Sequence, residues 1–270
     1  MQRSLRFAAA AAMALGFAGA GAQTTVKWMH IEMNPNIANY YKQVVGEFEA
    51  RNPGVKVDVQ VLENEAYKAK LTTLLQSSDK PHIIYSWGGG VLQSQVKAGV
   101  LQDIDAPMKG AWAESLSAGA VDAFSFQGKV WGAPMLMSQV GFYYNKAVFA
   151  KAGVDAETIK TWDQFLDAVK KIKASGSTPI IVGGADKWPV HFYWTHLALR
   201  LGGKTAFDAA QRGEAGGFGN EVFVRAGEIF KQLVDLQPFQ NGFLGATAPQ
   251  AYGQFGDGKG AMTLMGNWIY

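Results

Sequence analysis

The chain contains no cysteine among its 270 residues. Disulfides, thiol catalysis and thiolate-bound metals are therefore excluded from this sequence. No run rich in Lys or Arg is present either, and 25 basic residues stand against 22 acidic ones. Binding to nucleic acid or to an anionic membrane surface consequently has no electrostatic support.

The common cofactor and catalytic motifs are also missing. The three glycines Gly88 to Gly90 are not followed by Gly-Lys-Ser/Thr, so they are no phosphate loop, and no dinucleotide fingerprint, His-Glu-x-x-His or Gly-x-Ser-x-Gly occurs. The histidines are His30, His82, His191 and His196. The last two are five residues apart, which does not suit a zinc-binding helix face. We expect no cofactor and no metal.

The first 22 residues have the pattern of a secretory signal peptide. Arg3 and Arg6 precede an uncharged apolar run over residues 7–18, and Ala20 and Ala22 give small residues at the cleavage positions. The run has about 12 residues, whereas a membrane span needs about 20. We predict cleavage after Ala22, no lipid anchor and a periplasmic protein. The alternative is an apolar helix at the start of a cytosolic protein.

Strand and helix patterns alternate in the following segment. A short strand is predicted at 26–29, alternation of apolar and polar residues predicts a strand at 55–61, and a buried-type strand is predicted at 82–87. Helices are predicted at 40–51, 66–76 and 91–98. This order is typical of a mostly parallel sheet covered on both faces.

A second α/β unit is predicted to begin near Met135. A hairpin is expected at 124–131, just before it. Strands are then expected at 140–144, 179–182 and 261–265, and helices at 161–176, 189–201 and 223–236. The first of these helices opens with Thr161 and Gln164, which form the sequence pattern of a capping box.

Aromatic residues gather at the ends of predicted elements. Trp87 precedes the three glycines, Trp268 follows a strand, and Trp188, His191 and Trp194 crowd one helix start. Aromatic faces beside polar side chains suit a sugar ring, which has apolar faces and polar edges. Packing in the core is the alternative. The glycine turn also offers free backbone N–H groups, although a turn that only needs small residues explains it equally well.

Six stretches together give the chain a resemblance to the extracellular solute-binding proteins of family 1, which deliver sugars to ABC importers. They are VKWMH at 26–30, FEARNPGVKV at 48–57, PHIIYSWGGG at 81–90, YYNK at 143–146, TWDQF at 161–165 and FGDGKGAMTLMGNW at 255–268. The resemblance implies a type II-like periplasmic binding protein fold. It has two α/β lobes, here 23–134 and 135–270, with a hinge crossing at Pro134 and a ligand cleft between the lobes.

The resemblance also implies site residues. Glu32 lies where the family often places an acidic contact, Trp87 and Gly88 match the loop after the third strand, and Asn267 with Trp268 match the Gly-x-Trp of the second lobe. Together with the aromatic cluster, the predicted ligand-binding residues are Glu32, Trp87, Gly88, Gln139, Trp188, His191, Trp194, Asn267 and Trp268.

The sequence departs from the family in two ways. Many members carry acidic residues after the proline of the crossing, whereas this chain has Ser138 and Gln139. Contacts there are expected to be neutral. Members usually continue for well over a hundred residues beyond the Gly-x-Trp, so a chain ending at Tyr270 is expected to be a fragment with both lobes incomplete.

The expected function is reversible capture of a mono- or oligosaccharide by a monomer that delivers it to permease subunits in the inner membrane, without enzymatic chemistry. One alternative is the same fold with a polyamine, an anion or a metal as ligand. Tyr143 and Tyr144 alternate across a strand, which weakens a tyrosine-based metal site. A secreted glycosidase is the other alternative, because the number of carboxylates alone does not exclude a catalytic pair.

Overall fold

The computed structural model describes residues 23–270, which form two compact units that meet in sequence between Trp87 and Gly88. The predicted signal peptide lies outside the described residues. Within them, no helix has the length and apolar character needed to cross a membrane. The lobe boundary at residues 134 and 135 stays a prediction.

Unit 1 is built on a parallel sheet, as predicted. Its strands are β1 (Thr24–His30), β2 (Val55–Val61) and β3 (Ile83–Ile84), in the order β2-β1-β3. The third strand is shorter than its apolar run predicts. Pairing with β1 covers two residues and is flanked by two further bonds, from the His82 N–H to the Lys27 carbonyl and from the Tyr85 N–H to the Met29 carbonyl.

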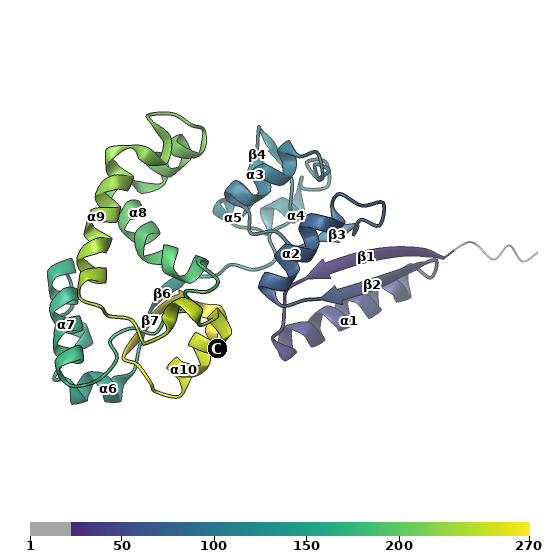
Figure 1. Ribbon diagram of the computed structural model, residues 1–270. Helices are drawn as coiled ribbons and strands as arrows, with labels where there is room; N and C mark the ends of the chain where they lie inside the picture. Colours follow the sequence, from purple (N-terminus) through teal and green to yellow (C-terminus); the bar gives the residue numbers. More distant parts are fainter. Residues whose placement is uncertain (1–22) are drawn as a thin grey trace, which may run out of the picture. The chain divides into compact units, whose positions relative to one another are not determined.

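Two helices cover opposite faces of this sheet (Figure 1). The connection from β1 to β2 and the connection from β2 to β3 run in opposite directions across the sheet, so two right-handed crossovers place their helices on opposite faces. Helix α1 (Pro35–Arg51) begins earlier than predicted, because Asn34 caps it and a proline fits its first turn. Helix α2 (Asn64–Leu74) has Glu63 as its cap. Met29, Tyr67 and Leu71 form the buried centre of the unit.

Unit 2 begins with short elements. They are α3 (Gly89–Lys97), α4 (Ala111–Glu114), α5 (Ala118–Ala123), β4 (Ser125–Phe126) and β5 (Lys129–Val130). The predicted hairpin is confirmed, since β4 and β5 pair antiparallel. Gln127 and Gly128 both have positive φ, 53° and 74°, as a two-residue hairpin turn of type I′ requires.

The centre of unit 2 is the antiparallel pair of β6 (Val140–Tyr144) and β7 (Met262–Gly266). Every residue of β7 is buried. The predicted strand at 179–182 is wrong as a regular strand: only Ile180 forms bridges, to Phe239 and to Met262. The segment is nevertheless buried beside β7, which explains its apolar sequence.

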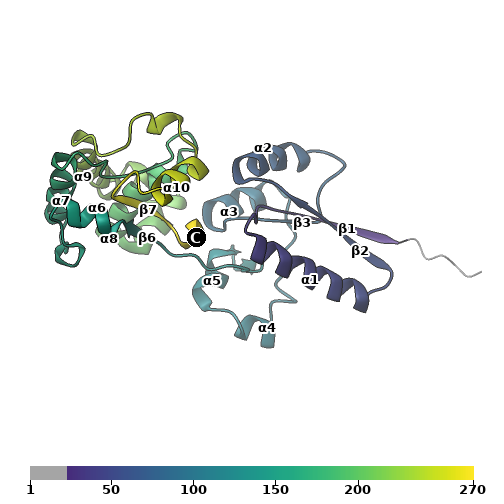
Figure 2. The ribbon, with the colours of Figure 1, turned by 90° about the horizontal axis from the view of Figure 1, so that it is seen from below.

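Helices surround this pair (Figures 1 and 2). They are α6 (Lys146–Lys151), α7 (Trp162–Ala174), α8 (Trp188–Gln211), α9 (Glu221–Asp235) and α10 (Ala248–Gly256), and 3-10 turns η1 (Ala156–Thr158), η2 (Gly217–Gly219), η3 (Phe243–Gly245) and η4 (Asn267–Ile269) lie between or after them. The capping box at Thr161 is confirmed. Helix α8 runs past the predicted stop, but Gly203 interrupts it with φ 64° and ψ −175°.

Candidate functional site

The predicted site residues of unit 1 lie at one edge of its sheet. Glu32 follows β1 and Trp87 follows β3, and these two strands are adjacent and parallel. Their carboxyl ends therefore meet at the same edge, where open α/β sheets bind ligands. We call Glu32, Lys68, Tyr85 and Trp87 the strand-end cluster.

Trp87 is held by aromatic and cationic neighbours. Its ring makes edge contacts with Tyr67 and Tyr85 at centroid distances of 5.8 and 5.4 Å, and the Lys68 ammonium lies 5.4 Å from its centroid. The Tyr67 hydroxyl donates to the Tyr85 carbonyl at 2.7 Å, which fixes the loop that carries the indole. The Trp87 side chain remains 38% exposed, so part of it is available to a ligand.

Glu32 is positioned by its own loop. Its Oε1 accepts from the Asn34 N–H at 2.7 Å, and its N–H donates to Nδ1 of the buried His30 at 3.1 Å. Burial raises the pKa of Tyr41 and of Tyr85, and the nearby Glu32 carboxylate raises both further. Both phenols are therefore held in their neutral form near the Glu32 carboxylate.

Gly88 is required by the backbone of its turn. Its φ is 70°, and a Cβ there would lie 2.8 Å from the Ala123 carbonyl oxygen. It precedes α3 as a cap without a side-chain hydrogen bond. The turn thus needs small residues for structural reasons, and a contact from Gly88 to a ligand stays a prediction.

Unit 2 brings several predicted residues together at the end of β7 and the start of α8. The rings of Trp188 and Trp268 have centroids 6.3 Å apart at an angle of 57°, and Phe192 lies 5.6 Å from Trp188 and 6.3 Å from Trp268. Trp268 is 45% exposed. We call Trp188, Phe192 and Trp268 the aromatic surface.

Polar groups surround the aromatic surface. The Trp268 Nε1–H donates to the Tyr252 hydroxyl at 3.2 Å. His191 is exposed, and its Nδ1 is hydrogen-bonded to the Trp188 carbonyl, so Nδ1 carries a proton. In a neutral ring of this tautomer, Nε2 is an acceptor.

Gln139 and Asn267 extend the β6–β7 pairing by one step. The Asn267 N–H donates to the Gln139 carbonyl at 3.0 Å, and the Gln139 N–H donates to Asn267 Oδ1 at 3.3 Å. Both side chains are exposed, and Asn267 directly precedes Trp268. The predicted pair therefore shares the turn that carries the indole of Trp268.

Trp194 lies in a different place. It packs against Phe207, Phe218 and Phe223 in a second core between α8 and α9, and its Nε1–H donates to the Phe223 carbonyl at 3.1 Å. This environment gives Trp194 a packing role. We therefore leave it out of the aromatic surface, and its ligand contact remains only a prediction.

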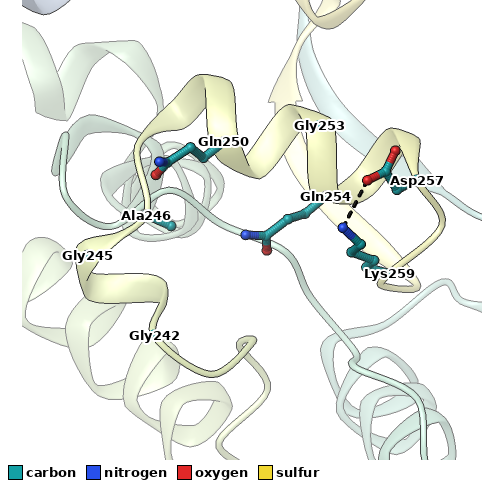
Figure 3. Close-up of a pocket in the computed structure, with 8 residues that line it drawn as sticks. All are labelled: Gly242, Gly245, Ala246, Gln250, Gly253, Gln254, Asp257 and Lys259. Carbon is teal, nitrogen blue, oxygen red and sulfur yellow. Dashed lines mark ion pairs between the residues drawn. The ribbon is translucent and has the colours of Figure 1, made fainter.

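A shallow hollow of about 450 Å³ lies elsewhere in unit 2, along η3, α10 and the following turn (Figure 3). Its lining consists of Gly242, Gly245, Ala246, Gln250, Gly253, Gln254, Asp257 and Lys259. None of these is aromatic, and Asp257 and Lys259 are paired at 2.9 Å. The Gln250 side chain is engaged in capping α10, since its Oε1 accepts from the Thr247 N–H at 2.9 Å. The hollow contains none of the predicted site residues.

No group of three or more metal-ligating side chains occurs among residues 23–270. His82 Nδ1 accepts from the Lys27 N–H at 2.9 Å. Burial and the nearby Arg200 lower the pKa of His196, while hydrogen bonds to the Phe192 and Val140 backbone partly oppose this. Tyr143 contacts Tyr270 and Tyr144 contacts Phe149, so the two tyrosines point to different neighbours.

Sequence reasoning missed three neighbours of the predicted tryptophans, namely Lys68, Tyr85 and Tyr252, the last on α10, a helix that was not predicted. Phe192 belongs to the aromatic stretch that the sequence shows around Trp188, but it was not among the predicted ligand-binding residues. A signal for α10 was available, because Thr247 and Gln250 form a capping box with proline between them.

Comparisons with known proteins agree with this picture. Residues 34–270 match the family described as bacterial extracellular solute-binding protein. A multiple sugar-binding protein of Streptococcus mutans is 26% identical over 235 residues, covering 84% of this chain and 54% of its own length.

Solved structures share the fold. One, from work on xylan utilisation by the thermophilic bacterium Caldanaerobius polysaccharolyticus, is 30% identical with a TM-score of 0.80 and covers 91% of this chain and 62% of its own. A chitin oligosaccharide binding protein is 27% identical, also with a TM-score of 0.80, covering 92% and 62%. The predicted α/β solute-binding-protein fold is confirmed.

The chain spans about half the length of the Streptococcus mutans relative and about three fifths of these solved chains. The family match nevertheless covers most of the present sequence, from Asn34 to Tyr270. Glu32 lies two residues before its start. These family members are binding proteins rather than enzymes. The chain belongs to the family of bacterial extracellular solute-binding proteins.

Proposed function

We propose that this chain is the carbohydrate-binding part of a sugar ABC importer, and that it captures a mono- or oligosaccharide reversibly. The observation that carries the proposal is the pairing of Trp188 with Trp268, whose rings adjoin at 6.3 Å beside His191, Asn267 and Gln139. Membership of a solute-binding family, with a multiple sugar-binding protein and a chitin oligosaccharide binding protein among the similar proteins, supports it.

The chemistry of the aromatic surface favours a neutral sugar. The C–H groups on a pyranose face bind to an indole face, while its hydroxyl groups need hydrogen-bond partners at the ring edge. His191 Nε2 is an acceptor for such a hydroxyl, and the Asn267 side-chain amide is a donor because its Oδ1 already accepts from Gln139. None of these groups carries a fixed charge.

The strand-end cluster supplies the second set of contacts. The Glu32 carboxylate accepts hydrogen bonds from sugar hydroxyls, which are stronger when the acceptor is charged. Trp87 adds a further exposed indole face. The interlobe cleft implied by the resemblance stays a prediction, and the variants described below test each surface by itself.

The proposal includes export and delivery. The signal peptide with cleavage after Ala22 directs the chain to the periplasm, where it acts as a monomer and docks on permease subunits of the inner membrane. Delivery requires that the ligand favours the docking-competent conformation. Capture and release proceed without covalent chemistry.

Isothermal titration calorimetry of the purified chain tests the proposal. The sugar panel contains chitotriose, xylotriose, raffinose and maltose, and spermidine and sulfate represent the non-sugar alternatives. We expect saturable heat with at least one sugar, at a binding constant that Trp268→Ala weakens. A parallel assay with 4-nitrophenyl glycosides should release no nitrophenol.

Three results would overturn the proposal. The first is heat from spermidine or sulfate and from no sugar. The second is the absence of heat from every sugar of the panel, measured on a purified chain that is shown to be folded by its cooperative unfolding. The third is release of nitrophenol that persists through repurification, which would favour the glycosidase alternative.

A further inference from the structure

Gly266 lies directly beneath the indole of Trp268. A Cβ built on Gly266 would lie 1.9 Å from Cζ3 of Trp268 and 2.2 Å from both Cε3 and Cη2. Real Cβ atoms do not approach other heavy atoms this closely, so any side chain at position 266 requires the indole to move. The ring is folded back against the backbone at the end of β7.

The backbone of Gly266 does not itself require glycine. Its φ is −80° and its ψ is 162°, an extended conformation that alanine adopts readily. The nearest atoms that a Cβ at this position would meet therefore all belong to the Trp268 ring. A substitution to alanine consequently tests the ring position rather than backbone strain.

Tyr252 fixes the other edge of the same indole. Its hydroxyl accepts from the Trp268 Nε1–H at 3.2 Å and lies 3.5 Å from the Met265 sulfur of β7. The tyrosine projects from α10, which lies beside β7 in both views (Figures 1 and 2). The indole N–H is thus engaged within the protein, and Trp268 meets a ligand through its ring face.

We propose that Gly266 and Tyr252 are positioning residues that set the orientation of the Trp268 indole before any ligand binds, so that the sugar receives a preformed stacking face. The inference rests on the proposed function for its ligand. Its geometric part stands on the contacts of Gly266 and Tyr252 alone. A preformed face saves the ordering cost that a mobile side chain pays on binding.

The geometric part is tested without ligand, by the indole N–H signals of the chain's eight tryptophans in a ¹H–¹⁵N correlation spectrum. Trp268→Phe assigns the Trp268 signal by its loss. We expect Gly266→Ala to shift the Trp268 signal. Relative to the wild-type chain, Tyr252→Phe should shift the Trp268 signal upfield in the proton dimension and speed the exchange of this N–H with water, because its hydrogen-bond acceptor is lost. The Trp131 signal should stay in place, since its N–H donates to the Phe126 carbonyl elsewhere.

Gly141→Ala is the matched control. Gly141 lies in β6 opposite Met265, and a Cβ there meets nothing within 4 Å. This variant should leave all eight signals unchanged. An unmoved Trp268 signal in both Gly266→Ala and Tyr252→Phe would overturn the inference, whatever the chain binds. If Gly266→Ala fails to fold, Tyr252→Phe alone decides.

The ligand part is tested by a double-mutant cycle with the sugar that gives heat in calorimetry. We expect Gly266→Ala to weaken binding about fivefold or more in the wild-type background and to have no further effect in a Trp268→Ala background. Equal losses in both backgrounds would show that Gly266 acts independently of the indole and would overturn the positioning role. Absence of sugar heat in the wild-type chain would count against the proposed function, while the spectra still decide the geometry.

Discussion

The strand-end cluster of unit 1 and the aromatic surface of unit 2 both expose indole rings, but they differ in charge. Lys68 lies over the Trp87 ring, and the Glu32 carboxylate is at the same sheet edge. The Trp268 indole instead has the Tyr252 hydroxyl and the Asn267 amide beside it, and both of these groups are neutral.

The difference follows from how each surface is built. Parallel strands end together, so loops with charged residues gather at their carboxyl ends. The aromatic surface instead follows the antiparallel pair of β6 and β7. The hydrogen bond from the Asn267 N–H to the Gln139 carbonyl extends this pair and fixes the start of the turn that carries Trp268. We therefore expect unit 1 to contribute charge-assisted hydrogen bonds to a ligand, and unit 2 to contribute stacking.

The largest effect is expected at Trp268. Replacing Trp268 with alanine removes the stacking face, and we expect sugar affinity to fall about tenfold or more, as for a central aromatic anchor. Calorimetry with the sugar that binds the wild-type chain measures the change. Trp112→Ala is the matched control, because both side chains are 45% exposed and Trp112 lies on α4, outside both surfaces. Equal losses in the two variants would contradict a specific role for the aromatic surface.

A smaller loss is expected for the charge of Glu32. Glu32→Gln keeps an oxygen that accepts from the Asn34 N–H but removes the charge, so sugar affinity should fall about three- to tenfold. The loss should depend little on salt, because the contact is a short hydrogen bond to a neutral sugar rather than a pair of separated charges. An unchanged affinity would remove Glu32 from the site and leave binding to unit 2.

The sequence predicted the fold of unit 1 well because each element carries its own local signal. Alternating valines mark β2, and a helical apolar stripe with a stop at Pro53 marks α1. The structure adds the order β2-β1-β3, which places Glu32 and Trp87 at one edge. That proximity depends on strand pairing between residues far apart in sequence, which local patterns do not contain.

Unit 2 was predicted less well because burial by tertiary contacts overrides local pattern there. The apolar segment ending at Val182 looks like a strand, yet it makes only bridges at Ile180. The pairing of Trp188 with Trp268 joins residues 80 positions apart through α8 and β7, and Trp194, six positions after Trp188, lies in another core. Sequence proximity therefore grouped two tryptophans that the helix separates.

A modest effect is expected from the cation over Trp87. Lys68→Met keeps the apolar stem but removes the ammonium, and a partly exposed cation–π contact contributes about 0.5–1 kcal/mol. Sugar affinity should fall by no more than about two- to fivefold, because the contact is present in the free protein and reaches the ligand only through the position of the Trp87 ring. Lys70→Met on the same helix is the control, since the Lys70 ammonium contacts Gln60 rather than Trp87. A loss of equal size from Lys70→Met would indicate a general charge effect instead.

The smallest expected effect is a pH dependence of stability at His30, beneath the strand-end cluster. Burial lowers the pKa of His30 below its ordinary value of 6.5, while the Glu32 carboxylate partly opposes this. Because the folded protein disfavours the imidazolium, the unfolded chain binds more protons below about pH 6.5. The free energy of unfolding should be at its full value above that pH and fall as the pH drops from 6.5 through the folded pKa.

Glu32→Gln sharpens this prediction by linking it to the charge that distinguishes the two surfaces. Removing the carboxylate takes away the favourable interaction with the imidazolium, so the pKa of His30 should fall further. A titration of the His30 Cε1–H signal by NMR measures both values, and His30→Gln identifies the signal by its loss. His196 serves as the internal reference, because its lowered pKa arises from burial and Arg200 in unit 2. A His30 pKa that rises, or a His196 pKa that moves with it, would show that the Glu32 charge does not act locally at the strand ends.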